Sequence, residues 1–246
     1  MSDLKIHKLT TQAEFATVVQ LQREIWGYAD VELLPLRLFI VAEKIGGQVL
    51  GAFDGSRMVA FCLAIPGLKA GGKHYLHSHM LGVLPEYRNS GLGRQMKLMQ
   101  REEALSRGIE LIEWTFDPLE LKNAYFNIER LGAVVRRFVR NQYGSTSSHL
   151  HGGLPTDRCT AEWWINSERV RNILEGKVAP ATAIKERISI PSNISELRRS
   201  DPAHARQIQI EAASSFETFF NRRLAVVKFE KTEESGSYLL GEWALE

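Results

Sequence analysis

The sequence predicts a mixed α/β (α+β) fold in which helices flank a β-sheet, and two local patterns carry that prediction. Asp54-Gly55 separates two apolar runs at residues 48–53 and 58–65. Such a dipeptide between two strands is typical of a tight antiparallel hairpin. The second pattern is a strand at residues 74–83, a glycine-rich turn, a helix and a strand at 111–116. Strands joined by a crossover helix run parallel, so the sheet contains both kinds of pairing.

The N-terminal part begins with a short strand at residues 4–9 and continues with two helices. Thr11 and Glu14 are spaced as a capping box, so a helix begins there, and Gly27 ends it. Pro35 opens a second helix that stops before Gly46-Gly47. Further along the chain we expect helices from about 91 to 107 and 119 to 131, and strands at 133–141 and 161–166.

The C-terminal part has a weaker pattern beyond Glu175. Asp201-Pro202 predicts an N-cap followed by a first-turn proline. A helix follows on the apolar spacing of residues 208–219, and two strands are expected at 224–229 and 237–240. We expect two domains, residues 1–180 and a smaller α+β C-terminal extension, residues 181–246.

The composition excludes several classes of protein. The 246 residues are 44% hydrophobic and 24% charged, which is typical of a globular chain. The 31 Lys and Arg residues almost balance the 29 Asp and Glu residues, for a net charge of +2, unlike a dedicated nucleic-acid binder. Two cysteines are too few for a disulfide framework. No apolar run approaches the ~20 residues of a membrane span, and the first residues carry no apolar signal core. We therefore expect a cytoplasmic protein whose partners include neither nucleic acid nor a membrane.

The most informative segment is the turn between the strand at 74–83 and the next helix. A tight turn that leads into a helix presents free backbone amides, and the helix dipole adds partial positive charge, so such a turn binds phosphate groups. Gly91 and Gly93 let a ligand approach the backbone closely. Arg88 and Arg94 can add side-chain charge.

Two common phosphate-binding motifs do not fit this turn. A nucleotide P-loop requires Lys followed by Ser or Thr after its last glycine, where this chain has Arg94-Gln95. The dinucleotide-binding motif requires a third glycine, at the position of Met96.

Arg88, Gly91 and Gly93, after a strand that ends in Val83-Leu84-Pro85, resemble the pyrophosphate-binding motif of the GCN5-related N-acetyltransferase (GNAT) superfamily. The resemblance covers roughly residues 4–141. A narrower likeness points to a poorly characterised branch of predicted acetyltransferases with a C-terminal extension. The resemblance implies a sheet splayed open between the strands that end at Val83 and Phe116, with acetyl-CoA as the cosubstrate in the opening. The cofactor-binding residues that it implies are Leu81, Val83, Arg88, Asn89, Ser90, Gly91, Leu92, Gly93, Arg94 and Asn123.

His77 and His79 are the candidate general bases. Alternation along a strand puts both on one face, and histidine has a pKa suited to accept the proton of an amine. Their spacing from Arg88 is similar to that of the paired histidines of arylalkylamine N-acetyltransferases. The alternative that both are buried, hydrogen-bonded strand residues without a catalytic role stays open. A metal site with His74 is not expected, because no cysteine or carboxylate is spaced to complete it.

The residue at the position of the family's proton donor differs in this chain. Many members carry a tyrosine four residues before the glycine that ends the helix, and Ile128 stands there in this chain. Tyr125 lies three residues earlier, roughly on the same helical face, and is the candidate donor, although an ordinary packing role is the alternative. Glu113 is a further candidate base, but we expect it to be a polar residue on a half-exposed face.

The leading functional hypothesis is an acetyl-CoA-dependent N-acetyltransferase, in which the amine of a small molecule attacks the thioester directly. The alternative is a catalytically silent module that binds acyl-CoA. We expect a small-molecule amine as the partner. Residues 181–246 are expected to cover the acceptor pocket or to make a homodimer contact.

Overall fold

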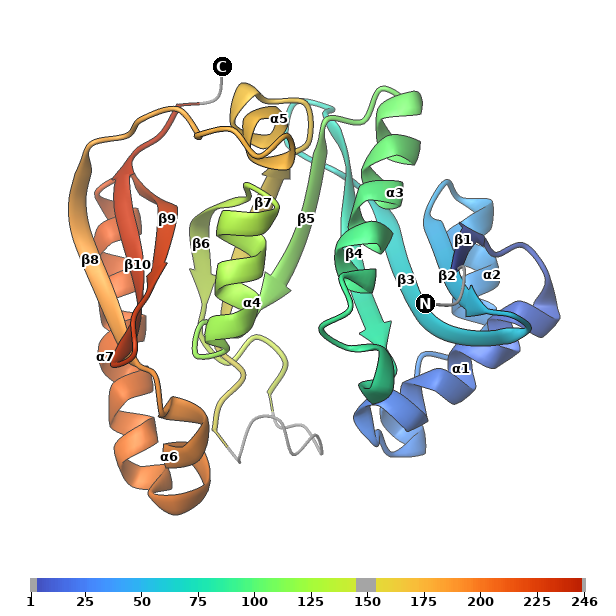
Figure 1. Cartoon of the computed structure of the whole chain (residues 1–246), viewed down its shortest axis with the longest axis horizontal. Helices are drawn as coiled ribbons and strands as arrows, with labels where there is room; N and C mark the ends of the chain where they lie inside the picture. Colours follow the sequence, from blue (N-terminus) through green and yellow to red (C-terminus); the bar gives the residue numbers. More distant parts are fainter. Residues whose placement is uncertain (1–3, 145–153, 245–246) are drawn as a thin grey trace. The chain divides into compact units, whose positions relative to one another are not determined.

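The computed structural model describes residues 4–144 and 154–244 (Figure 1). The chain divides into two compact units, Met1–Glu113 and Trp114–Glu246. The division falls inside strand β5 (Leu111–Phe116). It does not test the expected boundary near residue 180, which stays a prediction.

The first unit contains the elements that the sequence predicted for it, with small shifts at their ends. Its helices are α1 (Gln12–Trp26), α2 (Leu36–Lys44) and α3 (Leu92–Ser106), with two short 3-10 helices, η1 (Asp30–Glu32) and η2 (Pro85–Tyr87). Its strands are β1 (Lys5–Lys8), β2 (Gln48–Asp54), β3 (Arg57–Leu68), β4 (His74–Val83) and the first half of β5. The capping box at the start of α1 is present, since Thr11 and Glu14 bond each other's backbone amides, and Gly27 ends the helix in the left-handed conformation.

The sheet of this unit is mixed, as predicted. The pairs β1–β2, β2–β3 and β3–β4 are antiparallel. The β4–β5 pair is parallel, with Leu76 opposite Ile112 and His77 opposite Glu113. The predicted hairpin and the predicted crossover are therefore both confirmed.

Strand β4 carries a β-bulge. Its Met80 lies opposite Leu63 of β3, and its Ser78 lies opposite the next residue, Ala64. Two steps along β4 thus match one step along β3, and His79 is the extra residue. A bulge redirects the side chain at that point and commonly occurs beside active sites.

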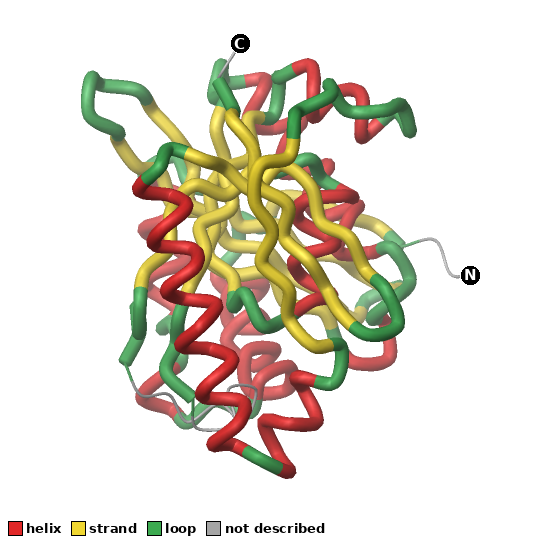
Figure 2. Tube along the Cα trace, turned by 90° about the vertical axis from the view of Figure 1, so that its left-hand side faces the viewer, coloured by secondary structure: helices red, strands yellow, loops and turns green. Residues whose placement is uncertain are grey.

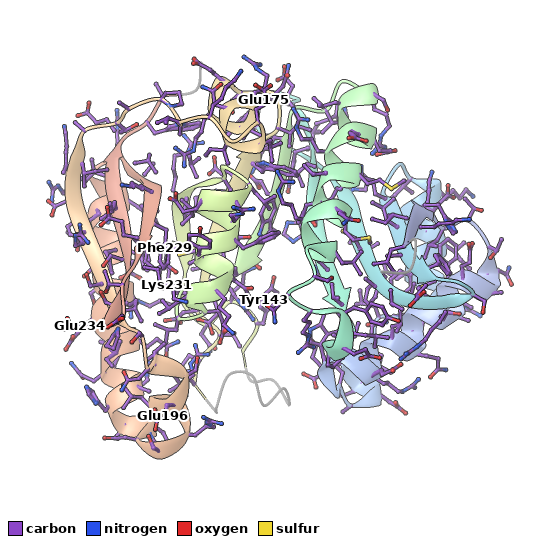
Figure 3. The ribbon with its side chains drawn as sticks, in the orientation of Figure 1. Tyr143, Glu175, Glu196, Phe229, Lys231 and Glu234 are labelled. Atoms are coloured by element: carbon purple, nitrogen blue, oxygen red, sulfur yellow. The ribbon has the colours of Figure 1, made fainter. Side chains whose placement is uncertain are left out.

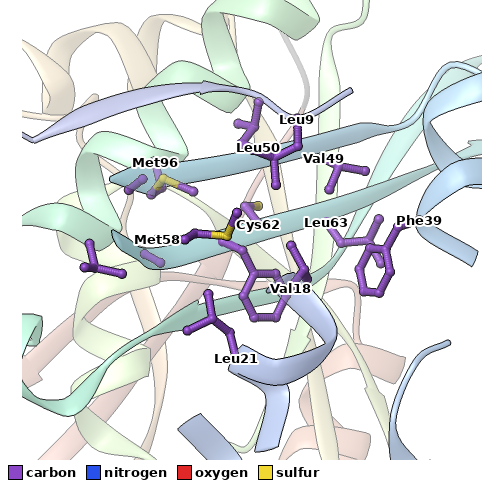
Figure 4. Close-up of a cluster of buried hydrophobic side chains, with 14 of the residues drawn as sticks. Leu9, Val18, Leu21, Phe39, Val49, Leu50, Met58, Cys62, Leu63 and Met96 are labelled. Carbon is purple, nitrogen blue, oxygen red and sulfur yellow. The ribbon is translucent and has the colours of Figure 1, made fainter. Parts of the chain in front are cut away.

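Helices cover both faces of the strands β3 and β4. On one face, the Phe61 ring meets Trp26 at the end of α1 edge-on, with centroids 5.6 Å apart. On the other face, the next residue, Cys62, accepts a hydrogen bond of 3.2 Å from Gln100 of α3. Figure 4 shows the apolar cluster around these strands, whose members include Leu9, Val18, Leu21, Phe39, Val49, Leu50, Met58, Leu63 and Met96.

The second unit is built on a second set of strands. Beyond β5 it contains β6 (Val134–Val139), β7 (Arg158–Trp164), β8 (Ile184–Pro191), β9 (Leu224–Lys231) and β10 (Ser235–Glu242). Its strand order is β7-β6-β9-β10-β8, with every neighbouring pair antiparallel. Its helices are α4 (Leu121–Tyr125), α5 (Glu168–Leu174), α6 (Ile194–Ser200) and the long α7 (Pro202–Asn221), which contacts β6, β8 and β9 (Figure 2).

Two features of this unit differ from the prediction. The helix expected at 119–131 is interrupted, because α4 is followed by the π-helical turn η3 (Phe126–Arg130), in which the Leu131 amide reaches back five residues to the Phe126 carbonyl at 3.1 Å. The elements β8, α5 and α6 were not predicted. The cap at Asp201 and the first-turn Pro202 are confirmed by a bond from the His204 amide to the Asp201 carboxylate at 3.0 Å.

Within residues 4–144 and 154–244, no helix combines the length and the apolar character needed to cross a membrane.

Candidate active site

The turn between β4 and α3 has the conformation of an anion-binding turn. Gly91 is the N-cap of α3 and has a φ of 86°, a left-handed conformation that glycine adopts without strain. Asn89 is left-handed as well, with a φ of 61°. The Ser90 hydroxyl donates to the Tyr87 carbonyl at 2.7 Å, which closes the turn. The Tyr87 hydroxyl donates to Asp54 at 2.7 Å, so the turn is fixed to the β2–β3 hairpin.

Four backbone amides of the turn point to no acceptor in the described parts of the chain. The Arg94 amide is used inside the turn, where it donates to the Gly91 carbonyl at 3.0 Å. The Leu92 amide makes a long bond of 3.4 Å to the Ser90 hydroxyl. The amides of Asn89, Ser90, Gly91 and Gly93 have no bond to residues 4–144 or 154–244. Exposed donors at a helix N-terminus are the elements of a phosphate site.

The space above the turn is open. A Cβ added at Gly91 would meet no atom within 4 Å, and one added at Gly93 would meet only the Leu81 side chain, at 3.9 Å. Asn89, Ser90 and Gly91 are exposed, whereas Leu92 is buried. The backbone at Gly91 is therefore not covered by side chains of the described residues.

The Arg88 side chain has a local partner that the sequence did not indicate. Its Nε donates to the Val83 carbonyl at 3.2 Å, and its Nη2 donates to the Ile25 carbonyl at 3.4 Å. Arg88 thereby links the end of α1 to the end of β4. The guanidinium is exposed, so its charge still contributes to the potential around the turn.

The last residues of β4 offer main-chain groups on one side. Within the first unit, β4 pairs with β5 only through Leu76 and His77, and from Ser78 to Val83 it pairs with β3 alone. Leu81 and Val83, which the resemblance assigns to the pantetheine arm, both lie in this stretch. Gly82 between them is required for packing, since a Cβ there would lie 2.8 Å from Ile25 and 2.9 Å from Trp26.

The two histidines lie together on β4. Their ring centroids are 5.9 Å apart, so the two rings lie near each other as predicted. His77 is half-buried and His79 is exposed, so the alternative is wrong about their burial, while a catalytic role for either residue stays a prediction. Desolvation by the surrounding chain nevertheless lowers the pKa of the His79 imidazole below its usual 6.5. A neutral imidazole at neutral pH can accept a proton.

Glu113 does not lie on a half-exposed face, and that prediction is wrong. It is 3% exposed, and its carboxylate pairs with the Lys69 ammonium at 2.7 Å. The carboxylate therefore has a charged partner inside the first unit. The structure therefore favours a structural role for Glu113 at the β4–β5 junction.

The remaining predicted residues lie in the second unit. Asn123 is exposed on α4. Tyr125 is 41% exposed, whereas Ile128 is fully buried, so the two do not share a face as predicted. The π-helical turn that begins at Phe126 changes the residues per turn between them, and sequence spacing cannot show this.

Sequence reasoning missed a second exposed tyrosine, Tyr143. Figure 3 labels it after the end of β6, and it is 47% exposed. Its hydroxyl lies 2.9 Å from the Thr115 hydroxyl on β5, and the Arg158 guanidinium lies 5.3 Å from its ring centroid. Only the fold brings these three residues together.

Among the described residues, no group of three or more histidine, cysteine or acidic side chains is arranged to hold a metal ion.

Comparison with known proteins agrees with this geometry. Residues 15–132 match the model of the acetyltransferase (GNAT) family. No curated protein sequence matches the chain. Among solved structures, the ribosomal-protein-S18-alanine N-acetyltransferase from Escherichia coli is 17% identical, with a TM-score of 0.52, and the match covers 67% of this chain and 95% of that one.

Two further structures are similar over the same extent. YncA from Salmonella typhimurium, a putative acetyltransferase with its cofactor acetyl-CoA, is 15% identical with a TM-score of 0.54, over 67% of this chain and 95% of that one. Arabidopsis thaliana NAA60, in complex with a bisubstrate analogue, is 16% identical with a TM-score of 0.52, over 66% of this chain and 98% of that one. At these identities the likeness shows the fold.

Proposed function

Because residues 15–132 belong to the acetyltransferase (GNAT) family, we propose that the protein is an acetyl-CoA-dependent N-acetyltransferase that acts on the amine of a small molecule. When bound, acetyl-CoA supplies an activated thioester. The acceptor attacks the thioester carbonyl through its neutral amine, so a C–N bond forms as the C–S bond breaks. No covalent bond to the protein is required.

The observation that carries this proposal is the row of four amides at Asn89, Ser90, Gly91 and Gly93, which lack acceptors among the described residues. A diphosphate offers several anionic oxygens in a small space, and hydrogen bonds to charged groups are stronger than those between neutral groups. The partial positive charge at the start of α3 adds to the attraction. The main chain of β4 near Leu81 and Val83 is the proposed partner of the pantetheine amides.

We assign the proton transfers to side chains of this chain. His79 is the proposed general base, because its imidazole is exposed and its pKa is lowered by desolvation. An amine is mostly protonated at neutral pH and must lose a proton before it can attack. His77, 5.9 Å away between ring centroids, is the proposed second group of the relay. Tyr125, whose hydroxyl has no partner in the described chain, is the proposed donor to the departing thiolate.

The test has a binding arm and a catalytic arm. Calorimetry measures binding of acetyl-CoA to the full chain, and thiol release is then followed over a panel of primary amines that includes aromatic, aliphatic and polyamine members. Binding with turnover on at least one amine supports the proposal. Failure to bind acetyl-CoA refutes it.

The residue at the usual proton-donor position supports a second candidate function. Ile128 is buried where many family members carry the tyrosine donor. A protein that binds acetyl-CoA and turns over no amine would be the silent acyl-CoA-binding module.

A further inference from the structure

Four polar side chains lie buried between α3 and the strands β3 and β4, outside the site described above. Lys97 and Gln100 come from α3, Ser78 from β4 and Cys62 from β3. Their exposed fractions are 3% for Lys97, 0% for Gln100, 4% for Ser78 and 0% for Cys62. A lysine is rarely buried this deeply.

The Lys97 ammonium lies at the centre of this cluster. Its Nζ donates to the Ser78 hydroxyl at 2.8 Å and to the Gln100 side-chain carbonyl at 3.0 Å. The Gln100 amide in turn donates to the Cys62 sulfur at 3.2 Å. The cluster therefore joins the helix that follows the anion-binding turn to the middle of β4.

Two contacts between α3 and β4 lie on either side of the bulge. Near the start of α3, Gly93 faces the Leu81 side chain, since a Cβ there would lie 3.9 Å from Leu81 Cδ2. One helical turn later, Lys97 bonds Ser78. Between these two points of β4 lies the extra residue, His79, directly after Ser78.

We propose that Lys97 is a positioning residue for the imidazole of His79: its hydrogen bond to Ser78 holds the β4 bulge and so fixes the direction in which that imidazole points. The structural part of this inference stands on the contacts alone. Its catalytic consequence rests on the proposed acetyltransferase function.

The energetics argue that packing alone does not explain this lysine. Burial lowers the pKa of the Lys97 ammonium from 10.5 to about 8, so the folded protein holds a desolvated cation near neutral pH. Such a cation lowers stability, whereas an apolar side chain of similar length would fill the same space without that cost. Residues that lower stability are commonly retained at functional sites.

The first test follows the His79 imidazole by NMR as the pH is varied, in the full chain and without any substrate. Ser78→Ala removes the acceptor and keeps the Lys97 charge, so a change in its spectra reports on the bulge rather than on the loss of a nearby cation. We expect the pKa of His79 to rise toward 6.5, because a ring released by the relaxed bulge moves away from the surrounding chain that desolvates it. Lys97→Met should move the pKa in the same direction. Cys62→Ser is the matched control: it alters the sulfur that lies 3.8 Å from the Ser78 hydroxyl and keeps both partners of the Lys97–Ser78 bond.

The double variant Ser78→Ala/Lys97→Met adds a second criterion. If the two residues act through one bond, the double variant shifts the His79 pKa no more than the larger single change. An unchanged His79 pKa in Ser78→Ala overturns the proposal, and so does a shift of equal size in Cys62→Ser. Should Lys97→Met fail to fold, Ser78→Ala and Cys62→Ser still decide the question.

The kinetic arm applies to any amine that the protein acetylates. Ser78→Ala should lower kcat by about tenfold, a part of the 10²–10⁴-fold that a well-placed general base contributes. The Kd of acetyl-CoA should stay unchanged, because the turn amides are intact. If no amine is turned over, the acetyltransferase proposal fails, while the NMR result still judges the positioning role of Lys97.

Discussion

Replacing Gly91 by alanine separates the role of the turn in folding from its role in binding. At a φ of 86°, an L-residue costs about 1–2 kcal/mol relative to glycine. No clash adds to that cost, since nothing lies within 4 Å of the added Cβ. For a chain of this size we therefore expect the Tm to fall by roughly 2–4 °C for each kcal/mol lost.

The effect on acetyl-CoA should be larger. In the proposed complex the methyl group would stand beside the four amides and keep the diphosphate from its closest approach. Losing one charge-assisted hydrogen bond costs about 1.5–3 kcal/mol, which weakens the Kd about ten- to a hundredfold.

Gly108 provides the matched control for this experiment. It follows the other end of α3 with a φ of 70°, and a Cβ there also meets nothing within 4 Å. Gly108→Ala should lower the Tm by a similar amount and leave the Kd of acetyl-CoA unchanged in calorimetry. Equal affinities of Gly91→Ala and Gly108→Ala would refute the assignment of the turn.

Three further predictions address stability and catalysis. Between pH 8 and 10.5 the folded chain binds fewer protons at Lys97 than the unfolded chain does, because burial lowers its pKa to about 8. The free energy of unfolding should therefore rise by about 3 kcal/mol over this range. Denaturant titrations of Lys97→Met should lack that rise. The same pH dependence in Lys97→Met and in the wild type would contradict the lowered pKa. Arg198→Met should destabilise the second unit by about 3–5 kcal/mol, because it leaves the buried Asp117 carboxylate without the guanidinium that lies 2.6 Å away. A fall of less than about 1 kcal/mol in the free energy of chemical unfolding would show that the ion pair is dispensable. Tyr125→Phe should lower kcat by about tenfold or more and leave the Kd of acetyl-CoA unchanged. Tyr143→Phe should keep kcat within about twofold of the wild type, because the Tyr143 hydroxyl is already bonded to Thr115. The opposite ranking of the two variants would reassign the proton donor to Tyr143.

The features that could be predicted from the sequence are those set by residues close together in the chain. The capping box at Thr11, the hairpin at Asp54-Gly55 and the glycine turn at Gly91 each encode a backbone conformation within a few residues. All three are present in the structure, and the third is the candidate anion-binding turn.

The elements that the sequence did not reveal depend on tertiary context. Strand β8 alternates only at its end, where Ile188 and Ile190 are buried, and its first residues are mostly exposed and charged. It is a strand because β10 pairs with it. Periodicity alone cannot show such an edge strand.

Two details of the region around His79 could not be predicted from the sequence either. The bulge at His79 exists only in relation to the register of β3, and no feature of β4 by itself marks it. Lysine side chains are rarely buried, yet Lys97 is 3% exposed. Ser78, its acceptor, lies 19 positions away along the chain.

The most direct test of the central claim is a crystal structure of the full chain with acetyl-CoA. We predict diphosphate oxygens within hydrogen-bond distance of the amides of Asn89, Ser90, Gly91 and Gly93, with the pantetheine arm along β4 at Leu81 and Val83. Ordered acetyl-CoA bound elsewhere, with these amides left to solvent, would contradict it.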